Sequence, residues 1–234
     1  AHHHGLPDIG LIGLTDIARS LRNMTAVSSV PVMVDADTGY GAEPGVRRTV
    51  MELERAGAAA IQIEDQVFPK RCGHMEGKQV ISTDDMVSKI RAAVEARRNP
   101  ETVIIARTDA LQVTGLDDAI DRCNTYAEAG ADLVFVDAPG SREELAEIAR
   151  RVDAPSMANM SETGKTPLLS AAELEELGYK VVIFPSTQTW IFAKVYQEFL
   201  DELKEKGTTR EFTDRMMSFN DVNELLGLQR WDRK

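Results

Sequence analysis

The sequence predicts an α/β fold in which short parallel strands alternate with helices and close into a (β/α)8 barrel of the TIM type. Three observations support this prediction. Six short runs rich in β-branched residues or alanine are separated by segments with helical patterning. Polar, reactive residues follow nearly every run, as expected where strand ends surround one barrel mouth. No glycine-rich nucleotide loop follows the first run, which argues against an open dinucleotide-binding sheet.

The six expected strands recur at intervals that leave room for a helix between neighbours. They are Val30–Ala36, Ala59–Glu64, Thr102–Ala106, Leu133–Asp137, Pro155–Asn159 and Val181–Pro185. The residues expected at helix starts are Pro44, the capping pair Ser141 with Glu144, and the capping pair Ser170 with Glu173. Gly57, Gly130 and Gly178 each fall between a helix and the next strand, where a helix C-terminus favours glycine.

A closed barrel of this kind needs eight strands, and the sequence shows six. The stretch Gly5–Ile17 has the character of a loop entering a helix, so we expect a strand before it. We therefore expect the complete polypeptide to extend upstream of Ala1 and to supply the first βαβ segment. Residues 1–234 are expected to form one α/β-barrel domain, with a helical extension over about 192–234.

Charge and cysteine content restrict the classes of partner. The formal net charge is −11, which disfavours binding to nucleic acid or to an anionic membrane surface. A small anionic substrate remains compatible, because a few local cations dominate the potential of a pocket. Two cysteines do not suggest a disulfide framework, and no run approaches the length of a membrane helix, so a cytoplasmic location is expected.

The first predicted strand ends in two aspartates that favour a metal site. Asp35 and Asp37 are spaced i, i+2, which places both side chains on one face of a strand. Two carboxylates this close need a cation, and Mg²⁺ prefers carboxylate and water oxygens. Glu64 and Asp65 end the next strand and are candidates for further outer ligands. The alternative for the aspartate pair is an Asx turn that leads into a helix cap.

A basic loop after the second strand carries the candidate catalytic cysteine. The run Pro69–His74 surrounds Cys72 with Lys70, Arg71 and His74, and these cations would raise its thiolate fraction. We expect this loop to close over a bound substrate and exclude water. Cys123 lies in a helical run and is predicted to be a packing residue.

Later strand ends supply groups that suit a carboxylate ligand. Arg107 is expected to clamp a substrate carboxylate with two hydrogen bonds, although an ion pair with a neighbouring acid is an alternative. Asn159 and Ser161 follow the fifth predicted strand and offer neutral hydrogen bonds.

With these motifs assembled, the chain resembles the isocitrate lyase and phosphoenolpyruvate mutase superfamily, and within it the 2-methylisocitrate lyase branch. The resemblance rests on the segments GLPDIG, VDADTGYG, IEDQ, KRCGH, ARTDA and ANMSETGKTPL. KRCGH is the most specific of them, because phosphonate mutases of the phosphoenolpyruvate type carry a different loop without this cysteine. Two segments depart from the pattern: Asp137 replaces a usual glutamate, and the run Met216–Gly227 differs from the segment typical of bacterial members.

The resemblance implies roles for individual residues. Asp37 would contact Mg²⁺ most directly, and Asp35, Glu64 and Asp8 would act largely through bound waters; Mn²⁺ is a second candidate ion. The implied catalytic residues are Cys72 as general acid–base, His74, Arg107 and Lys70. The implied substrate-binding residues are Arg107, Gly73, His74, Asn159, Ser161 and Asp137.

The implied activity is Mg²⁺-dependent cleavage of a 2-hydroxy dicarboxylate or tricarboxylate, similar to 2-methylisocitrate, into pyruvate or glyoxylate and a dicarboxylate such as succinate. Alternatives within the superfamily are 2,3-dimethylmalate lyase, oxaloacetate hydrolase and carboxyphosphonoenolpyruvate phosphonomutase. An alternative of another class is an inactive barrel that acts as a binding protein. The family also implies a homotetramer, a dimer of dimers, in which a C-terminal helix is exchanged between subunits.

Overall fold

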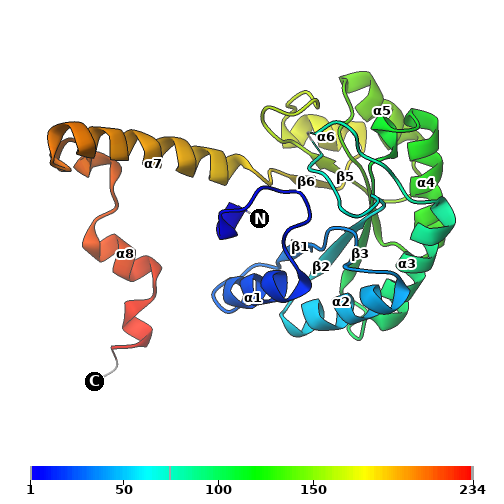
Figure 1. Ribbon diagram of the computed structural model, residues 1–234, viewed down its shortest axis with the longest axis horizontal. Coiled ribbons are helices and arrows are strands. Elements are labelled where there is room, and N and C mark those ends of the chain that lie inside the picture. The colour runs from blue at the N-terminus through cyan, green and yellow to red at the C-terminus, as the bar shows by residue number, and fades with distance from the viewer. Residues whose placement is uncertain (1, 74, 233–234) are drawn as a thin grey trace. The chain divides into compact units, whose positions relative to one another are not determined.

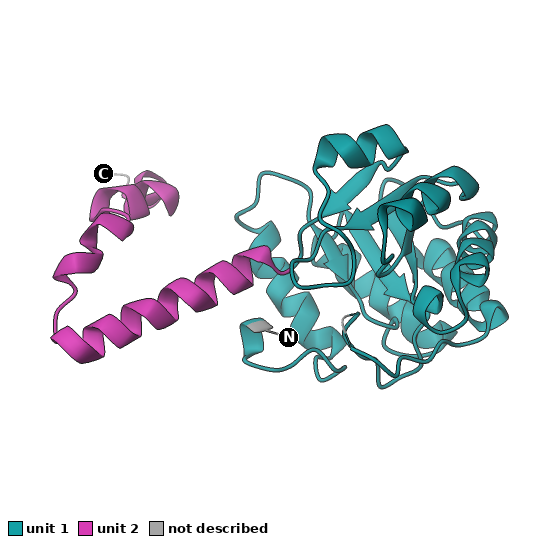
Figure 2. Cartoon of the chain, turned by 90° about the horizontal axis from the view of Figure 1, so that it is seen from above, with its two compact units in different colours: residues 1–185 teal, residues 186–234 magenta. Residues whose placement is uncertain are grey.

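The computed structural model describes residues 2–73 and 75–232. The chain divides into two compact units, Ala1–Pro185 and Ser186–Lys234, which Figure 2 colours separately. The sheet and the expected site residues belong to the first unit. The second unit is helical.

Six parallel strands form one sheet whose order follows the chain, and the sheet curls with helices against its outer face (Figure 1). The strands are β1 Met33–Asp35, β2 Ala60–Glu64, β3 Val103–Thr108, β4 Leu133–Val136, β5 Ser156–Asn159 and β6 Val181–Ile183. All six predicted strands are therefore confirmed. β1 and β6 are shorter than expected because each pairs with only one neighbour among the described residues.

Helices connect successive strands, as parallel pairing requires. The helical elements of this unit are η1 His2–His4, α1 Leu14–Thr25, α2 Glu43–Arg55, α3 Thr83–Ala96, η2 Ala110–Gln112, α4 Leu116–Glu128, α5 Arg142–Arg151 and α6 Ala171–Leu177. The predicted capping box of α6 is present, with Glu173 N–H donating to Ser170 Oγ and the Glu173 carboxylate accepting from the Ser170 N–H. Gly178 then ends α6 in a left-handed conformation (φ 111°), which glycine adopts without a Cβ clash.

Side chains alternate between the two faces of the sheet. The outer face packs against the helices in a large cluster that includes Ile61, Ile63 and Ile104. A smaller inner cluster contains Ile105 and Phe135 with their neighbours Leu133 and Met157. Each large buried aliphatic side chain stabilises the fold by about 1.5–3 kcal/mol. The sheet is therefore held mainly by its contact with the helices, whereas the inner face carries a thinner apolar layer.

Period-two alternation also decides which polar residues meet at the carboxyl ends of the strands. Glu64 follows Gln62, Arg107 follows Ile105 and Asp137 follows Phe135, each at a spacing of two. Glu64 pairs with Arg107 in the β2–β3 register. Asn159 ends β5 two residues after Met157 of the inner cluster. These side chains therefore continue the inner face beyond its apolar layer.

The second unit consists of α7 Thr187–Lys206, η3 Arg210–Arg215, α8 Phe219–Leu225 and η4 Leu228–Arg230. Phe199 packs edge-on against the buried Phe212 with ring centroids 5.3 Å apart. Phe219, Leu225 and Trp231 are exposed. Within the described residues, none of the helices has both the length and the apolar character that crossing a membrane demands.

Candidate active site at the carboxyl ends of the strands

Two aspartates mark the end of β1, and the chain turns sharply between them. Asp35 is the last residue of β1, whereas Asp37 lies beyond the strand with a left-handed backbone (φ 48°). The Asp37 N–H donates to Asp35 Oδ1 at 2.9 Å, so the Asx turn that the sequence allowed as an alternative does form. That turn uses one oxygen of Asp35 and leaves the Asp37 carboxylate for another partner.

A buried lysine ammonium provides that partner. Lys70 Nζ lies 2.8 Å from Asp37 Oδ1 and 2.5 Å from Asp8 Oδ1, and the lysine side chain is 5% exposed. Burial lowers the pKa of Lys70, but the surrounding carboxylates outweigh this effect and raise the pKa overall. Burial raises the pKa of Asp37, and the nearby charge of Asp35 raises it further. The carboxylates therefore concentrate negative charge around a position that already holds a cationic group.

Glu64 lies at the end of β2 and is almost fully buried. Neither of its carboxylate oxygens has a hydrogen-bond partner among the described residues. Arg107 Nε approaches Glu64 Oε2 at 3.4 Å, an ion-pair distance. Burial raises the pKa of Glu64 well above its usual value, because the opposing effect of Arg107 is smaller. A buried carboxylate without hydrogen bonds is costly and is typical of a group that binds a ligand.

Arg107 connects acids from three strand ends. Its Nε and Nη2 donate to the two oxygens of Asp109 at 2.9 and 3.0 Å, and Nη2 lies 3.0 Å from Asp137 Oδ2. Burial lowers the pKa of Arg107, but Asp109 and Asp137 raise it more. The ion pairs that the sequence allowed as an alternative are therefore formed. Binding of a substrate carboxylate by Arg107 stays a prediction, and it would require Arg107 to share its donors.

Asp65 was a candidate outer metal ligand, and the structure contradicts this. Its side chain points to the outer face and accepts hydrogen bonds from Thr108 Oγ1, Tyr126 OH and Arg122 Nη1 at 2.7, 2.8 and 3.2 Å. The Asp109 N–H donates to its other oxygen at 2.9 Å. Both oxygens are therefore occupied by protein donors. The physical reason is the strand alternation that turns residue 65 away from the face occupied by residue 64.

The loop that carries Cys72 is closed at its base. An isolated antiparallel bridge joins Gln66 to Val80. The Gln66 side chain bonds both backbone groups of Arg71, each at 2.9 Å. Cys72 is half-buried and its carbonyl accepts from the Met75 N–H at 2.8 Å. The base of the loop is therefore held by a backbone bridge and by hydrogen bonds of the Gln66 side chain.

Gly73 packs directly against the charged cluster. A Cβ at this position would lie 2.3 Å from Asp137 Oδ2 and 3.2 Å from Arg107 Nη2, so only glycine fits. Binding of a substrate carboxylate by Gly73, which the resemblance implied, stays a prediction. His74, which the resemblance assigned to catalysis and substrate binding, lies outside the described residues.

Two further predicted residues have polar atoms without partners. Asn159 Oδ1 and Ser161 Oγ are buried and accept or donate no hydrogen bond among the described residues. Tyr40 OH, in the loop after β1, is also buried without a hydrogen-bond partner among the described residues. Cys123, by contrast, is fully buried in α4, and burial raises the pKa of its thiol, as a packing residue requires.

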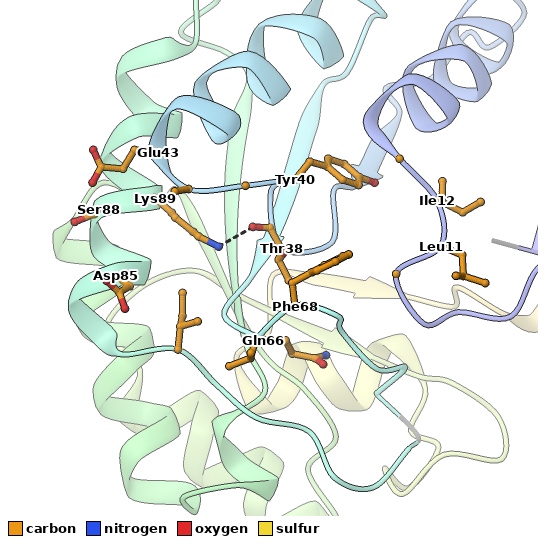
Figure 3. Close-up of a pocket in the computed structure, with 16 residues that line it drawn as sticks. Leu11, Ile12, Thr38, Tyr40, Glu43, Gln66, Phe68, Asp85, Ser88 and Lys89 are labelled. Carbon is orange, nitrogen blue, oxygen red and sulfur yellow. Dashed lines mark hydrogen bonds between the residues drawn. The ribbon is translucent and has the colours of Figure 1, made fainter.

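A cavity of about 630 Å³ lies beside this cluster, between the N-terminal loop and α3 (Figure 3). Leu11, Ile12 and Phe68 give it apolar walls, and Lys89 Nζ donates to Thr38 O at 3.0 Å at its edge. None of the predicted site residues lines it. The charged strand ends, and not this cavity, therefore form the candidate site.

The expected metal ligands are not gathered as a direct ligand set. Among the described residues, no group of three or more His, Cys, Asp or Glu side chains is arranged to hold a metal ion. Lys70 lies between Asp8 and Asp37, and Asp35 is engaged in its turn. Asp37 Oδ1 is therefore paired with Lys70, and direct contact of Asp37 with a metal ion stays a prediction.

The model of the phosphoenolpyruvate phosphomutase family matches residues 1–204. The chain belongs to this family. A 2-methylisocitrate lyase of Aeropyrum pernix is 50% identical over 229 residues, which are 98% of this chain and 74% of the relative. The family resemblance inferred from KRCGH and its companion segments is thereby confirmed.

Solved structures agree with this family assignment. A crystal structure of 2,3-dimethylmalate lyase, described as a PEP mutase/isocitrate lyase superfamily member, matches with a TM-score of 0.91 and 38% identity. The match covers 97% of this chain and 76% of that one. A phosphonopyruvate hydrolase in complex with oxalate and Mg²⁺ matches with a TM-score of 0.87 and 25% identity, covering 98% and 80% of the two chains.

Two residues of this family member's charged cluster were not predicted from the sequence. Asp109 lies in the segment ARTDA, and its spacing of two from Arg107 is a signal that places both side chains on one face. Lys78 was not singled out, because it lies in a loop without periodic patterning. In the structure its Nζ is 2.8 Å from Asp109 Oδ1 and 3.3 Å from Asp137 Oδ2.

Proposed function

We propose that this chain is a carbon–carbon lyase that cleaves a 2-hydroxy dicarboxylate or tricarboxylate, such as 2-methylisocitrate, into a 2-keto acid and a second carboxylate. The observation that carries this proposal is the set of buried polar atoms without partners at one edge of the sheet, on Glu64, Asn159 and Ser161. Arg107 lies at the same edge. A substrate with several carboxylates and a hydroxyl would satisfy these atoms. The name of the Aeropyrum relative, at 50% identity, supports the same substrate class.

We propose that these carboxylates hold a divalent cation, which is Mg²⁺ or, as the second candidate, Mn²⁺. The orphaned oxygens of Glu64 and the ammonium of Lys70 between Asp8 and Asp37 both indicate a site built for positive charge. Asp37 would hold the ion directly, and Asp35, Glu64 and Asp8 would hold it through water, which Mg²⁺ gives up reluctantly. When bound, the ion lowers the cost of ionising the substrate hydroxyl.

The chain's own residues would orient the substrate and move its protons. Arg107 binds one carboxylate by sharing donors now used by Asp109 and Asp137. Gly73 and His74, with Asn159 and Ser161, bind another. The hydroxyl proton passes to a water molecule in the site as the keto group forms, and the bond between the hydroxyl-bearing carbon and its neighbour breaks. The electron pair stays on that neighbouring carbon, to which Cys72 donates a proton. Lys70, at 5% exposure, keeps the anionic residues together during these steps.

The wider organisation follows from the same reasoning. We propose that the curled six-stranded sheet is part of a (β/α)8 barrel within one domain. The helical stretch of about 192–234 would be an extension that is exchanged between subunits of a cytoplasmic homotetramer. The exposed apolar residues of the second unit, including Phe219, Leu225 and Trp231, support an assembly role for it.

A substrate panel tests the proposal. Purified protein with Mg²⁺ is incubated with 2-methylisocitrate, 2,3-dimethylmalate, oxaloacetate and carboxyphosphonoenolpyruvate. Keto-acid release is followed with a coupled dehydrogenase, and all other products are followed by mass spectrometry. We expect 2-methylisocitrate to give a keto acid and succinate in equal amounts. Absence of a product from every compound, together with absence of Mg²⁺ binding, would favour an inactive binding protein.

2,3-Dimethylmalate is the second candidate substrate. The lyase for this compound shares the fold at a TM-score of 0.91, and Asp137 is one methylene shorter than the glutamate usual at its position. The second product distinguishes the two substrates, because 2,3-dimethylmalate yields a monocarboxylate and 2-methylisocitrate a dicarboxylate. Phosphonomutase activity would release no keto acid by carbon–carbon cleavage.

A further inference from the structure

Lys78 reaches from the returning limb of the Cys72 loop into the charged cluster. Its side chain is 2% exposed. Its Nζ donates to Gly73 O at 3.1 Å, to Asp109 Oδ1 at 2.8 Å and to Asp137 Oδ2 at 3.3 Å. One buried ammonium therefore joins the backbone beside Cys72 to acids that follow β3 and β4.

The acids that Lys78 contacts are the same ones that hold Arg107. Asp109 chelates the guanidinium, and Asp137 Oδ2 lies 3.0 Å from Nη2. Together with Glu64, the cluster contains three carboxylates and the two cations Arg107 and Lys78. Burial raises the pKa of Asp109, but Arg107 and Lys78 lower it more, so Asp109 stays ionised and retains both cations. Removal of Lys78 would leave Arg107 as the one cation among these acids.

We propose that Lys78 is a positioning residue that fixes the Cys72–Gly73 segment against the strand ends and shares Asp109 and Asp137 with Arg107. Its hydrogen bond to the Gly73 carbonyl fixes the position of the neighbouring Cys72 thiol. Its charge offsets two carboxylates, so that Arg107 has donors left for a substrate anion. The catalytic consequence rests on the proposed function, whereas the structural consequence for the loop does not.

The proposal predicts two separable effects of removing the ammonium. The segment loses its attachment, so the Cys72 thiol samples more positions and becomes more accessible. A displacement of about 1 Å at a reacting group can cost roughly 10² in rate. Without Lys78, Asp109 and Asp137 interact with Arg107 alone and hold its guanidinium more tightly. Arg107 is then less available to an anionic substrate, so the KM for that substrate should rise. A purely structural role would lower stability without changing thiol reactivity in the folded protein.

The experiment compares Lys78→Gln and Lys78→Arg with Lys180→Gln. Lys180 is exposed and directly precedes β6, so it lies at the amino-terminal end of a strand, whereas the cluster lies at the carboxyl ends. Iodoacetamide labelling of Cys72 in folded protein is timed by peptide mass spectrometry, and trypsin cleavage after Arg71 is timed on the same samples. We expect labelling of the Lys78→Gln variant to be at least roughly tenfold faster, with kcat reduced by roughly 10² and KM raised. Lys78→Arg should recover part of each loss, and Lys180→Gln should match the wild type.

Labelling and cleavage within twofold of the wild type in both Lys78 variants would overturn the proposal, because the loop would then be held by other contacts. If Lys78→Gln does not fold, Lys78→Met, which also removes the ammonium, gives the same comparison. Faster labelling without lyase activity in any protein, the wild type included, would retain the positioning role and remove the proposed function instead.

Discussion

Glu64 and Asp65 are neighbours at the end of β2, yet their surroundings are opposite. Asp65 faces the helices and has a protein donor for each oxygen, from Thr108, Tyr126, Arg122 and the Asp109 backbone. Glu64 faces the inner side, and its oxygens have no hydrogen bond among the described residues. The fold satisfies one carboxylate completely and leaves the other unsatisfied at about equal burial. We infer that the outer face of the strand ends serves stability and the inner face serves ligand binding.

The largest effect is expected on the inner side, at Asp37. Asp37→Ala should reduce Mg²⁺-dependent turnover to the level of EDTA-treated wild-type protein, because the proposed direct ligand is lost. Turnover and Mn²⁺ binding are measured together. Asp121→Ala, which removes an exposed carboxylate on α4, is the control and should leave both unchanged. Undiminished turnover of the wild type after exhaustive EDTA treatment would exclude a metal requirement.

The next effect is expected at Cys72. Cys72→Ser should lower turnover by about 10²–10⁴, the usual contribution of a general acid–base group, because a hydroxyl is a much weaker acid than a thiol. Substrate affinity and the thermal midpoint should barely change. Retention of more than about a tenth of the turnover would remove Cys72 from the mechanism. Cys123→Ser is the matched control, and it should cost stability, because Cys123 is fully buried, without changing turnover per folded molecule.

Asp109 joins the two faces and should give a smaller, pH-dependent effect. Its N–H binds Asp65, and its carboxylate binds Arg107 and Lys78, which lower its pKa although burial raises it. A lowered pKa contributes stability that is present above the unfolded value of about 3.9 and is lost as pH falls through the folded value. Asp109→Asn should therefore reduce the free energy of unfolding at pH 7 and flatten its decline below about pH 4. Parallel stability curves for wild type and variant in urea titrations would contradict this.

The strands could be predicted from the sequence because runs such as Ala59–Glu64 combine β-branched residues with a glycine before them and acids after them. The edge strands were predicted too long, since the pairing of β1 and β6 on one side only is a tertiary property. Strand ends also pointed to Asp37, Glu64 and Arg107. Strand alternation also predicts that Asp65 and Glu64 point to opposite faces of the sheet. The sequence does not indicate which of these two faces is the inner one.

The contacts made by loop residues could not be predicted from the sequence. Lys78 and Lys70 both lie in a segment without periodicity, so nothing in the sequence indicates that their ammonium groups are buried among acids from other strands. The contact of Arg107 with Asp137, which follows another strand, is likewise a matter of three-dimensional distance. Local patterns therefore identified the edge where the site lies, and tertiary contacts decide how its charges are paired.

The paired substitutions Glu64→Gln and Asp65→Asn test the division between the two faces most directly. Turnover per folded molecule and the thermal midpoint are measured for both variants in the same buffer with Mg²⁺. Glu64→Gln should lower turnover by roughly 10² or more while the midpoint stays level or rises, because a buried carboxylate without hydrogen bonds is replaced by a neutral amide. Asp65→Asn should lower the midpoint, at roughly 2–4 °C per kcal/mol of lost stability, and leave turnover per folded molecule nearly unchanged. The reverse result, with Glu64→Gln unfolding the protein and Asp65→Asn abolishing turnover in a stable one, would contradict the assignment of the inner face to ligand binding.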